Sequence, residues 1–75
     1  MLKIKFDRQI RERLEEIGIT TRQAIKIIKV PDFRFEKNGR IEARRQVNGK
    51  IFALTYTVFC NVVKIAYIEE KDSFY

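Results

Sequence analysis

The residues of this 75-residue chain that could do chemistry are its arginines and lysines. The chain has no histidine and a single cysteine, Cys60. This excludes a histidine general base, a Ser-His-Asp triad, a Cys-x-x-Cys redox pair and a zinc finger. We therefore expect neither a metal nor a cofactor. Sixteen Lys and Arg against ten Asp and Glu leave a net charge of +6, and such an excess favours binding to a polyanion through phosphate contacts.

The candidate nucleic-acid-binding residues lie in the second half of the chain, where apolar and polar residues alternate. Arg34, Arg40, Arg44 and Lys64 are expected on the polar face of a sheet, with Arg40, Thr57 and Lys64 in one row across three strands. Arg44 and Lys64 have no acid directly opposite in the expected register, so they are the sharpest candidates. The alternative is that the arginines on this face only pair with neighbouring glutamates.

The first half of the chain supplies a short strand and two helices. Residues 2–6 alternate apolar and basic, as a strand does. A helix is predicted over 7–17, with Asp7 as N-cap and Gly18 at its left-handed end. A Thr-x-x-Gln capping box then opens a second helix over 20–29, which the following Val-Pro stops.

From residue 33 onward the pattern has period 2 and is punctuated by two Asn-Gly pairs, which are strong hairpin signals. We expect a single domain over 1–75 with an α+β fold: two short helices packed on one face of a four- to five-stranded antiparallel meander sheet. The element order is β-α-α-β-β-β-β. The last four strands are predicted at 33–37, 40–47, 50–59 and 62–69, with 69–75 as a frayed tail.

The turns set the register of these strands. A two-residue loop at Asn48-Gly49 pairs Val47 with Lys50, and Arg45 then lies on the core face, where its long stem reaches toward water. At the first hairpin we expect a three-residue bulged loop over 37–39, because it turns both neighbouring phenylalanines toward the core. Tyr67 is likewise expected in the core. With its rings buried, the sheet would have no aromatic surface for base stacking.

Several short motifs match a family pattern over about residues 4–69: Arg11, Arg13, Ile17-Gly18-Ile19-Thr20, Asn38-Gly39-Arg40 and Gly49-Lys50-Ile51. With the element order, they give a chain that resembles the RelE/ParE superfamily of bacterial toxins, closest to small RelE-allied domains. The resemblance implies RNA cleavage or a ribosome-linked activity for some members, and gyrase inhibition for others. The related domains often carry a histidine where this chain has Arg8, so a histidine-dependent mechanism is not carried over.

RelE-like ribonucleases use Arg, Lys and Tyr on the sheet. By that resemblance the catalytic candidates here are Arg40, Arg44, Arg45, Lys64 and Tyr67. Cations can stabilise a pentacovalent phosphate, and a basic side chain or a tyrosine hydroxyl can move the 2′-OH proton.

The leading hypothesis is a small, basic, toxin-like cytoplasmic protein that binds RNA through its sheet face, with cleavage left open. RNA is favoured over DNA, and an antitoxin is the expected protein partner. The alternative is a non-enzymatic protein- or nucleic-acid-binding module, whose partner is another protein or a second copy of the chain paired through open sheet edges. No apolar stretch approaches the ~20 residues of a membrane span, and no signal peptide is recognisable.

Overall fold

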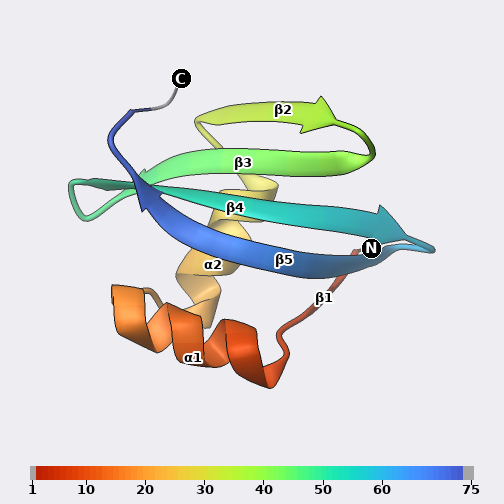
Figure 1. The fold of residues 1–75 in the computed structure, drawn as a ribbon, viewed down its shortest axis with the longest axis horizontal. Helices are drawn as coiled ribbons and strands as arrows, with labels where there is room; N and C mark the ends of the chain where they lie inside the picture. The colour runs from red at the N-terminus through yellow and green to blue at the C-terminus, as the bar shows by residue number, and fades with distance from the viewer. Residues whose placement is uncertain (1, 74–75) are drawn as a thin grey trace.

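Two helices lie on one face of a five-stranded sheet in the computed structural model, which describes residues 2–73 (Figure 1). This confirms the predicted α+β fold and the predicted element order. In chain order the elements are β1 (Lys3–Lys5), α1 (Arg8–Ile17), α2 (Thr21–Lys29), β2 (Phe33–Lys37), β3 (Arg40–Val47), β4 (Lys50–Phe59) and β5 (Val62–Lys71).

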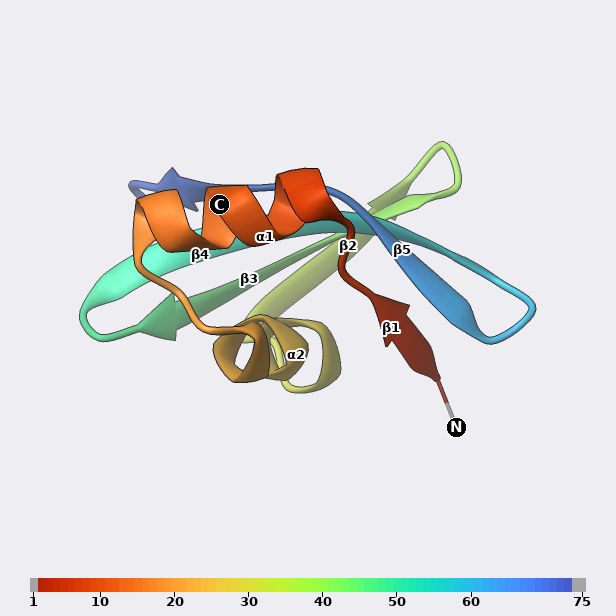
Figure 2. The ribbon, with the colours of Figure 1, turned by 90° about the horizontal axis from the view of Figure 1, so that it is seen from below.

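The strand order across the sheet is β1-β5-β4-β3-β2. Strands β2 to β5 form the predicted antiparallel meander, whereas β1 joins its edge parallel to β5. Seen from below, α1 and α2 both cover the same side of the sheet and β1 lies at its edge (Figure 2). We call the side covered by the helices the inner face and the opposite side the outer face.

Local signals in the sequence account for both helices. The Asp7 side chain accepts a hydrogen bond from the Ile10 N–H at 2.9 Å, and Gly18 ends α1 with φ +77°. The capping box of α2 is complete: the Thr20 hydroxyl accepts from the Gln23 N–H, and the Gln23 side chain accepts from the Thr20 N–H. These contacts satisfy backbone donors that the first turn leaves unpaired.

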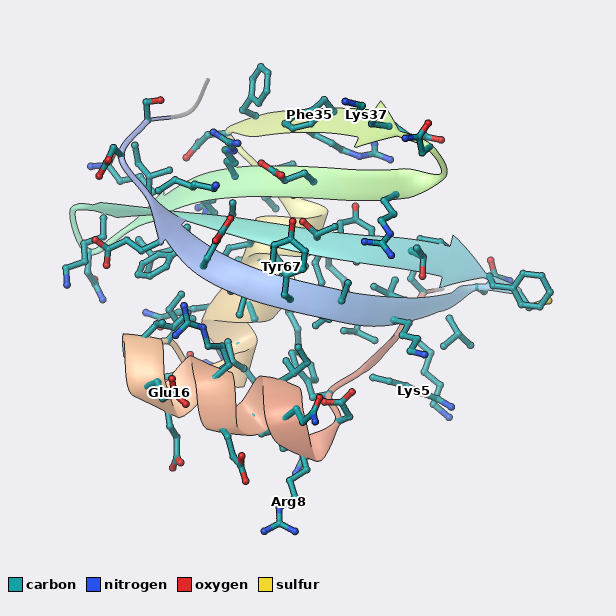
Figure 3. All side chains as sticks on the ribbon, viewed as in Figure 1. Lys5, Arg8, Glu16, Phe35, Lys37 and Tyr67 are labelled. Atoms are coloured by element: carbon teal, nitrogen blue, oxygen red, sulfur yellow. The ribbon has the colours of Figure 1, made fainter. Side chains whose placement is uncertain are left out.

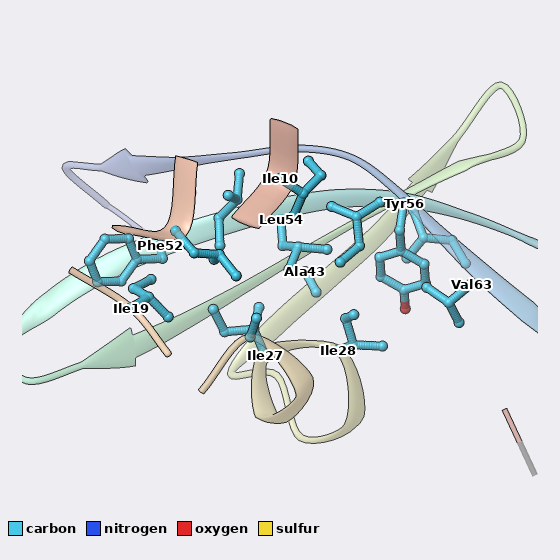
Figure 4. Close-up of a cluster of buried hydrophobic side chains, with 14 residues drawn as sticks. Ile10, Ile19, Ile27, Ile28, Ala43, Phe52, Leu54, Tyr56 and Val63 are labelled. Atoms are coloured by element: carbon cyan, nitrogen blue, oxygen red, sulfur yellow. The ribbon is translucent and has the colours of Figure 1, made fainter. Parts of the chain in front are cut away.

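The core lies between the helices and the inner face (Figure 4). Phe52, Leu54 and Tyr56 of β4 are buried there, as the register predicted from Asn48-Gly49 requires. The helices contribute apolar residues at helical spacing. Their buried side chains are Ile10 and Leu14 from α1, and Ala24, Ile27 and Ile28 from α2.

The first hairpin differs from the prediction. Lys37 pairs with Arg40 across a two-residue turn, in which Asn38 and Gly39 have φ of +53° and +78°. The predicted bulged loop is therefore wrong, and the phenylalanines of β2 lie on the outer face. The two-residue turn matches the twist of the strands. In addition, α2 packs on β3 and β4, and the inward residues of β2 are exposed, so turning the rings inward would not have buried them.

A β-bulge changes the register of the last hairpin. Tyr56 pairs with Ile65 but Thr55 pairs with Tyr67, so Ala66 is an extra residue in β5. The bulge places Tyr67 on the outer face and buries Ile68 in its stead, which corrects the prediction of a core Tyr67. Isoleucine fills a dry core without a hydroxyl to satisfy. Strand β5 also continues to Lys71, so the frayed tail predicted over 69–75 is wrong for residues 69–71, while 74 and 75 lie outside the described residues.

Thr20→Ala is expected to lower the free energy of unfolding by about 1 kcal/mol, because it removes the hydroxyl half of the capping box. Urea denaturation followed by circular dichroism measures the change. Thr21→Ala, one residue inside the helix, is the matched control and should stay within about 0.5 kcal/mol of the parent. Equal losses for the two variants would contradict the role of the cap.

Candidate functional site

A row of basic side chains crosses the outer face of the sheet. Lys5 pairs with Lys64, Lys64 with Thr57, and Lys37 with Arg40. Arg40 stands opposite Thr57, one step beyond the Ile41–Tyr56 pair. We call Lys5, Lys64, Arg40 and Lys37 the basic row. With neighbouring strands ~4.8 Å apart, the row spans roughly 19 Å from β1 to β2.

The four cations of the basic row have no ion-pair or hydrogen-bond partner within residues 2–73. All four residues are exposed. Their positive charge is therefore available to a ligand, with no carboxylate to displace.

Farther along the outer face, toward the β3–β4 turn, the charges are already paired. The Arg44 guanidinium donates to the Glu42 carboxylate, and both side chains are largely buried. Lys71 Nζ lies 2.7 Å from a Glu69 carboxylate oxygen. That hydrogen bond, together with the attraction of the two charges, raises the pKa of Lys71 above its usual value. The outer face thus divides into a half with free cations and a half with neutralised ones.

Next to the basic row the outer face is hollowed. The hollow measures about 420 Å³, and two aromatic side chains flank it: Phe35 from β2, 38% exposed, and Tyr67 from β5, 45% exposed. Both are labelled in Figure 3. Glu42 and Thr55 lie between them in the same row of the sheet. The remaining lining residues are Lys37, Asn38 and Arg40.

Thr55 also lines this hollow, and its buried hydroxyl has no hydrogen-bond partner in the described part of the chain. The residue is 5% exposed. A buried hydroxyl without a partner costs free energy of about 1–3 kcal/mol.

Thr55→Val is therefore expected to raise the free energy of unfolding, by about 1 kcal/mol, since it removes the unpaired hydroxyl and keeps a side chain of similar shape. The measurement is a urea midpoint at a common slope. Thr57→Val on the same strand, where the side chain is less buried, is the control and should change stability less. A clear loss of stability in Thr55→Val would mean that the hydroxyl already has a stabilising partner.

A second hollow, of about 480 Å³, lies at the other end of the basic row beside the β4–β5 turn. Lys5 and Lys64 line it together with Phe59, which is 80% exposed. The basic row therefore runs between two hollows, each with an aromatic ring at its wall.

The structure brings together three of the residues proposed from the sequence. Arg40 and Tyr67 line the same hollow, and Lys64 lies in the basic row. The predicted row of Arg40, Thr57 and Lys64 is confirmed by the register. Arg44 shares the outer face, but it is paired with Glu42, donates to the Ser73 carbonyl at 3.1 Å and stacks over Phe35. No acid stands directly opposite Arg44, as predicted, since Phe33 and Ala53 flank it. The guanidinium is nevertheless neutralised, because Glu42 lies on the same strand and face two residues earlier.

Two other candidates lie on the inner face. The prediction that Arg34 lies on the outer face is wrong, because the two-residue turn directs its side chain to the opposite side from Arg40. Arg34 pairs with Ala43 and borders a hollow beside α2. Arg45 is on the predicted inner side, where its guanidinium donates to the Val30 carbonyl. Neither shares a surface with the basic row.

Sequence reasoning missed four members of the site: Lys5, Lys37, Phe35 and Phe59. The Asn-Gly pair was a usable signal for two of them, since a type I′ turn directs both Lys37 and Phe35 outward. The outward position of Phe59 could have been predicted from the two-residue turn at Cys60-Asn61, because that turn places Phe59 on the same face as Thr57. Lys5 had no local signal, because its partner strand lies almost 60 residues away.

Comparison with protein-family models, with curated proteins and with solved structures gives no match. The fold and the site define a small α+β domain with a basic, aromatic-flanked sheet face. Among residues 2–73 there is no cluster of His, Cys, Asp and Glu side chains that could hold a metal ion. Nor is any described helix long and apolar enough to cross a membrane.

Proposed function

We propose that this protein binds single-stranded RNA on the outer face of its sheet. The observation that carries the proposal is the unpaired basic row beside a hollow with two exposed aromatic walls. Lysines and arginines along a groove bind backbone phosphates, and aromatic rings stack with bases in a sequence-tolerant way. Both kinds of group occur here on one continuous face.

A single strand fits this surface better than a duplex does. Tyr67 and Phe35 can stack only with bases that are unpaired and turned toward the sheet. The floor between the two rings is formed by Thr55 and by Glu42, whose carboxylate is already paired with Arg44. The resemblance of the element order to RelE/ParE toxins supports RNA over DNA.

The toxin-like part of the proposal is that this face cleaves the RNA it binds. In such a reaction the 2′-oxygen attacks phosphorus, the bond to the 5′-oxygen breaks, and a 2′,3′-cyclic phosphate forms. Arg40 would stabilise the negative charge that develops on the phosphate. The Tyr67 hydroxyl beside it would relay the 2′-OH proton to solvent water, and water would protonate the leaving 5′-oxygen.

The test is to incubate the purified protein with labelled single-stranded RNA of about 12 nucleotides at about 50 mM and about 300 mM salt. Binding and cleavage are followed in parallel, with duplex RNA and single-stranded DNA of the same sequence for comparison. We expect salt-sensitive binding that is strongest for single-stranded RNA. Absence of binding at low salt would refute the proposal, and binding without cleavage would refute only its catalytic part.

The toxin-like role has a second, cellular test. Expression from a tightly controlled promoter should arrest growth, and a variant that lacks Arg40 and Lys64 should be tolerated at the same protein level. An antitoxin would be an acidic protein that covers the basic row and restores growth. Normal growth with the parent protein would favour the alternative of a non-enzymatic binding module.

A further inference from the structure

Strand β2 is an open edge of the sheet with an unusual charge pattern. Its sequence from Phe33 to Lys37 places Arg34 and Glu36 on either side of Phe35, and all three side chains are exposed. Neither Arg34 nor Glu36 has an ion-pair partner in the described part of the chain. The three residues line a shallow hollow of about 380 Å³ at this edge.

Arg34 and Glu36 also have backbone N–H and C=O groups available for hydrogen bonds at the edge of the sheet. In a two-residue hairpin the pair next to the turn exchanges hydrogen bonds, and every second pair after it does so too. Lys37 and Phe35 therefore direct their N–H and C=O groups toward β3. Arg34 and Glu36 direct theirs to the open edge, which is a template for another strand.

We propose that β2 pairs in antiparallel fashion with β2 of a second copy of this chain, with the two-fold axis at Phe35. In this register Arg34 faces Glu36 of the second copy, and Glu36 faces its Arg34. These are the residues whose backbone groups are free, so hydrogen bonds and opposite charges coincide. Shifting the register by two residues in either direction sets Arg34 against Arg34 or Glu36 against Glu36.

The second copy also extends the outer face. Phe35 lies across from Phe35 of the second copy, and Phe33 lies across from its Lys37, where a cation can sit against the ring. Phe33 and Phe35 already form a tilted pair with ring centroids 5.7 Å apart. The dimer thus joins two five-stranded sheets into one of ten strands, with the four rings side by side.

The opposite edge of the sheet does not offer the same pairing. Strand β1 has only three residues, and its sequence Lys-Ile-Lys presents two like charges. Antiparallel self-pairing there would gain fewer hydrogen bonds and no charge complement. The β2 edge is itself short, so we expect a weak dimer with a Kd in the range of about 10 μM to about 1 mM.

Charge reversal tests the proposed register in the absence of RNA. Sedimentation equilibrium up to ~1 mM should show a dimer for the parent protein. Arg34→Glu and Glu36→Arg should each weaken it at least about tenfold, because both cross-strand pairs then carry like charges. An equimolar mixture of the two variants should form a heterodimer, and the double variant R34E/E36R should recover the parent affinity.

A disulfide trap gives an independent measurement of the two-fold axis. In a Cys60→Ser background, Phe35→Cys should form a dimer on mild oxidation, since residues paired in this way have Cα atoms ~4.5 Å apart. Lys37→Cys is the matched control on the same strand and face. Its Cα atoms would be about 14 Å apart in the dimer, beyond the reach of a disulfide.

A parent protein that stays monomeric up to ~1 mM, with no cross-link in Phe35→Cys, would overturn the proposal. So would a dimer whose affinity neither charge reversal changes, or equal cross-linking at residues 35 and 37. Because no RNA is present in these measurements, their failure would not bear on RNA binding, nor would loss of RNA binding bear on the dimer.

Discussion

Arg40→Ala combined with Lys64→Ala is expected to weaken binding to single-stranded RNA by about 10- to 100-fold at about 0.1 M salt. The two residues lie on either side of Thr57 in the basic row, and neither is neutralised within residues 2–73. Each lost phosphate contact should also reduce the slope of log K against log salt, by about 1.4 for the pair. Fluorescence anisotropy titrations at four salt concentrations measure both quantities.

The matched control removes the same charges from the other side of the molecule. Arg22 and Lys26 are exposed on α2, which lies against the inner face. Arg22→Ala/Lys26→Ala should keep most of the affinity and of the salt slope. If both double variants lose affinity equally, the binding depends on total charge, and the basic row has no special part in it.

Tyr67→Ala is expected to weaken RNA binding by about 5- to 150-fold, because one stacked base contributes about 1–3 kcal/mol. The ring is 45% exposed and forms one wall of the hollow on the outer face. Unlike the charge variant, this one should leave the salt slope unchanged. An unchanged affinity would show that Tyr67 does not contribute to RNA binding.

Tyr67→Phe separates stacking from proton transfer at the same position. The phenyl ring keeps the π-face, so binding should remain within about threefold of the parent. If the protein cleaves RNA with the help of the hydroxyl, cleavage should fall by about 100-fold or more while binding persists. Cleavage at the parent rate in Tyr67→Phe would assign that proton transfer to another group.

The helices and the positions of the hairpins could be predicted because their causes are local. Asp7 and Gly18 bound α1, and the capping box at Thr20 opens α2, all within one turn of the backbone that they serve. The Asn-Gly pairs fix two chain reversals in the same way. Once the turn at 48–49 was placed, the register of β3 with β4 followed by pairing residues outward from the turn.

The register errors arose where tertiary packing, and not the local sequence, determines which side of a strand is buried. Sequence reasoning buried both phenylalanines of β2 on the assumption that the inner face is covered there, but α2 packs on β3 and β4. The bulge at Ala66 exchanges Tyr67 for Ile68 in the core, and no residue near it signals an extra position in the strand. Both errors concealed the aromatic wall of the site. The row of Arg40, Thr57 and Lys64 was predictable because it depends only on the β3–β4 pairing and on the part of the β4–β5 hairpin between its turn and the bulge.

The parallel pairing of β1 with β5 has a kinetic consequence. Strands β2 to β5 can form stepwise through local hairpins, but β1 has no partner until residues 62–64 are in place. Contacts of such long range form late, since they carry the greatest loop-closure entropy. During synthesis, Lys5 can therefore join the outer face only after the chain has been made as far as β5. A chain arrested before β5 would lack Lys64 and the strand that positions Lys5. The basic row is therefore complete only after the last folding step.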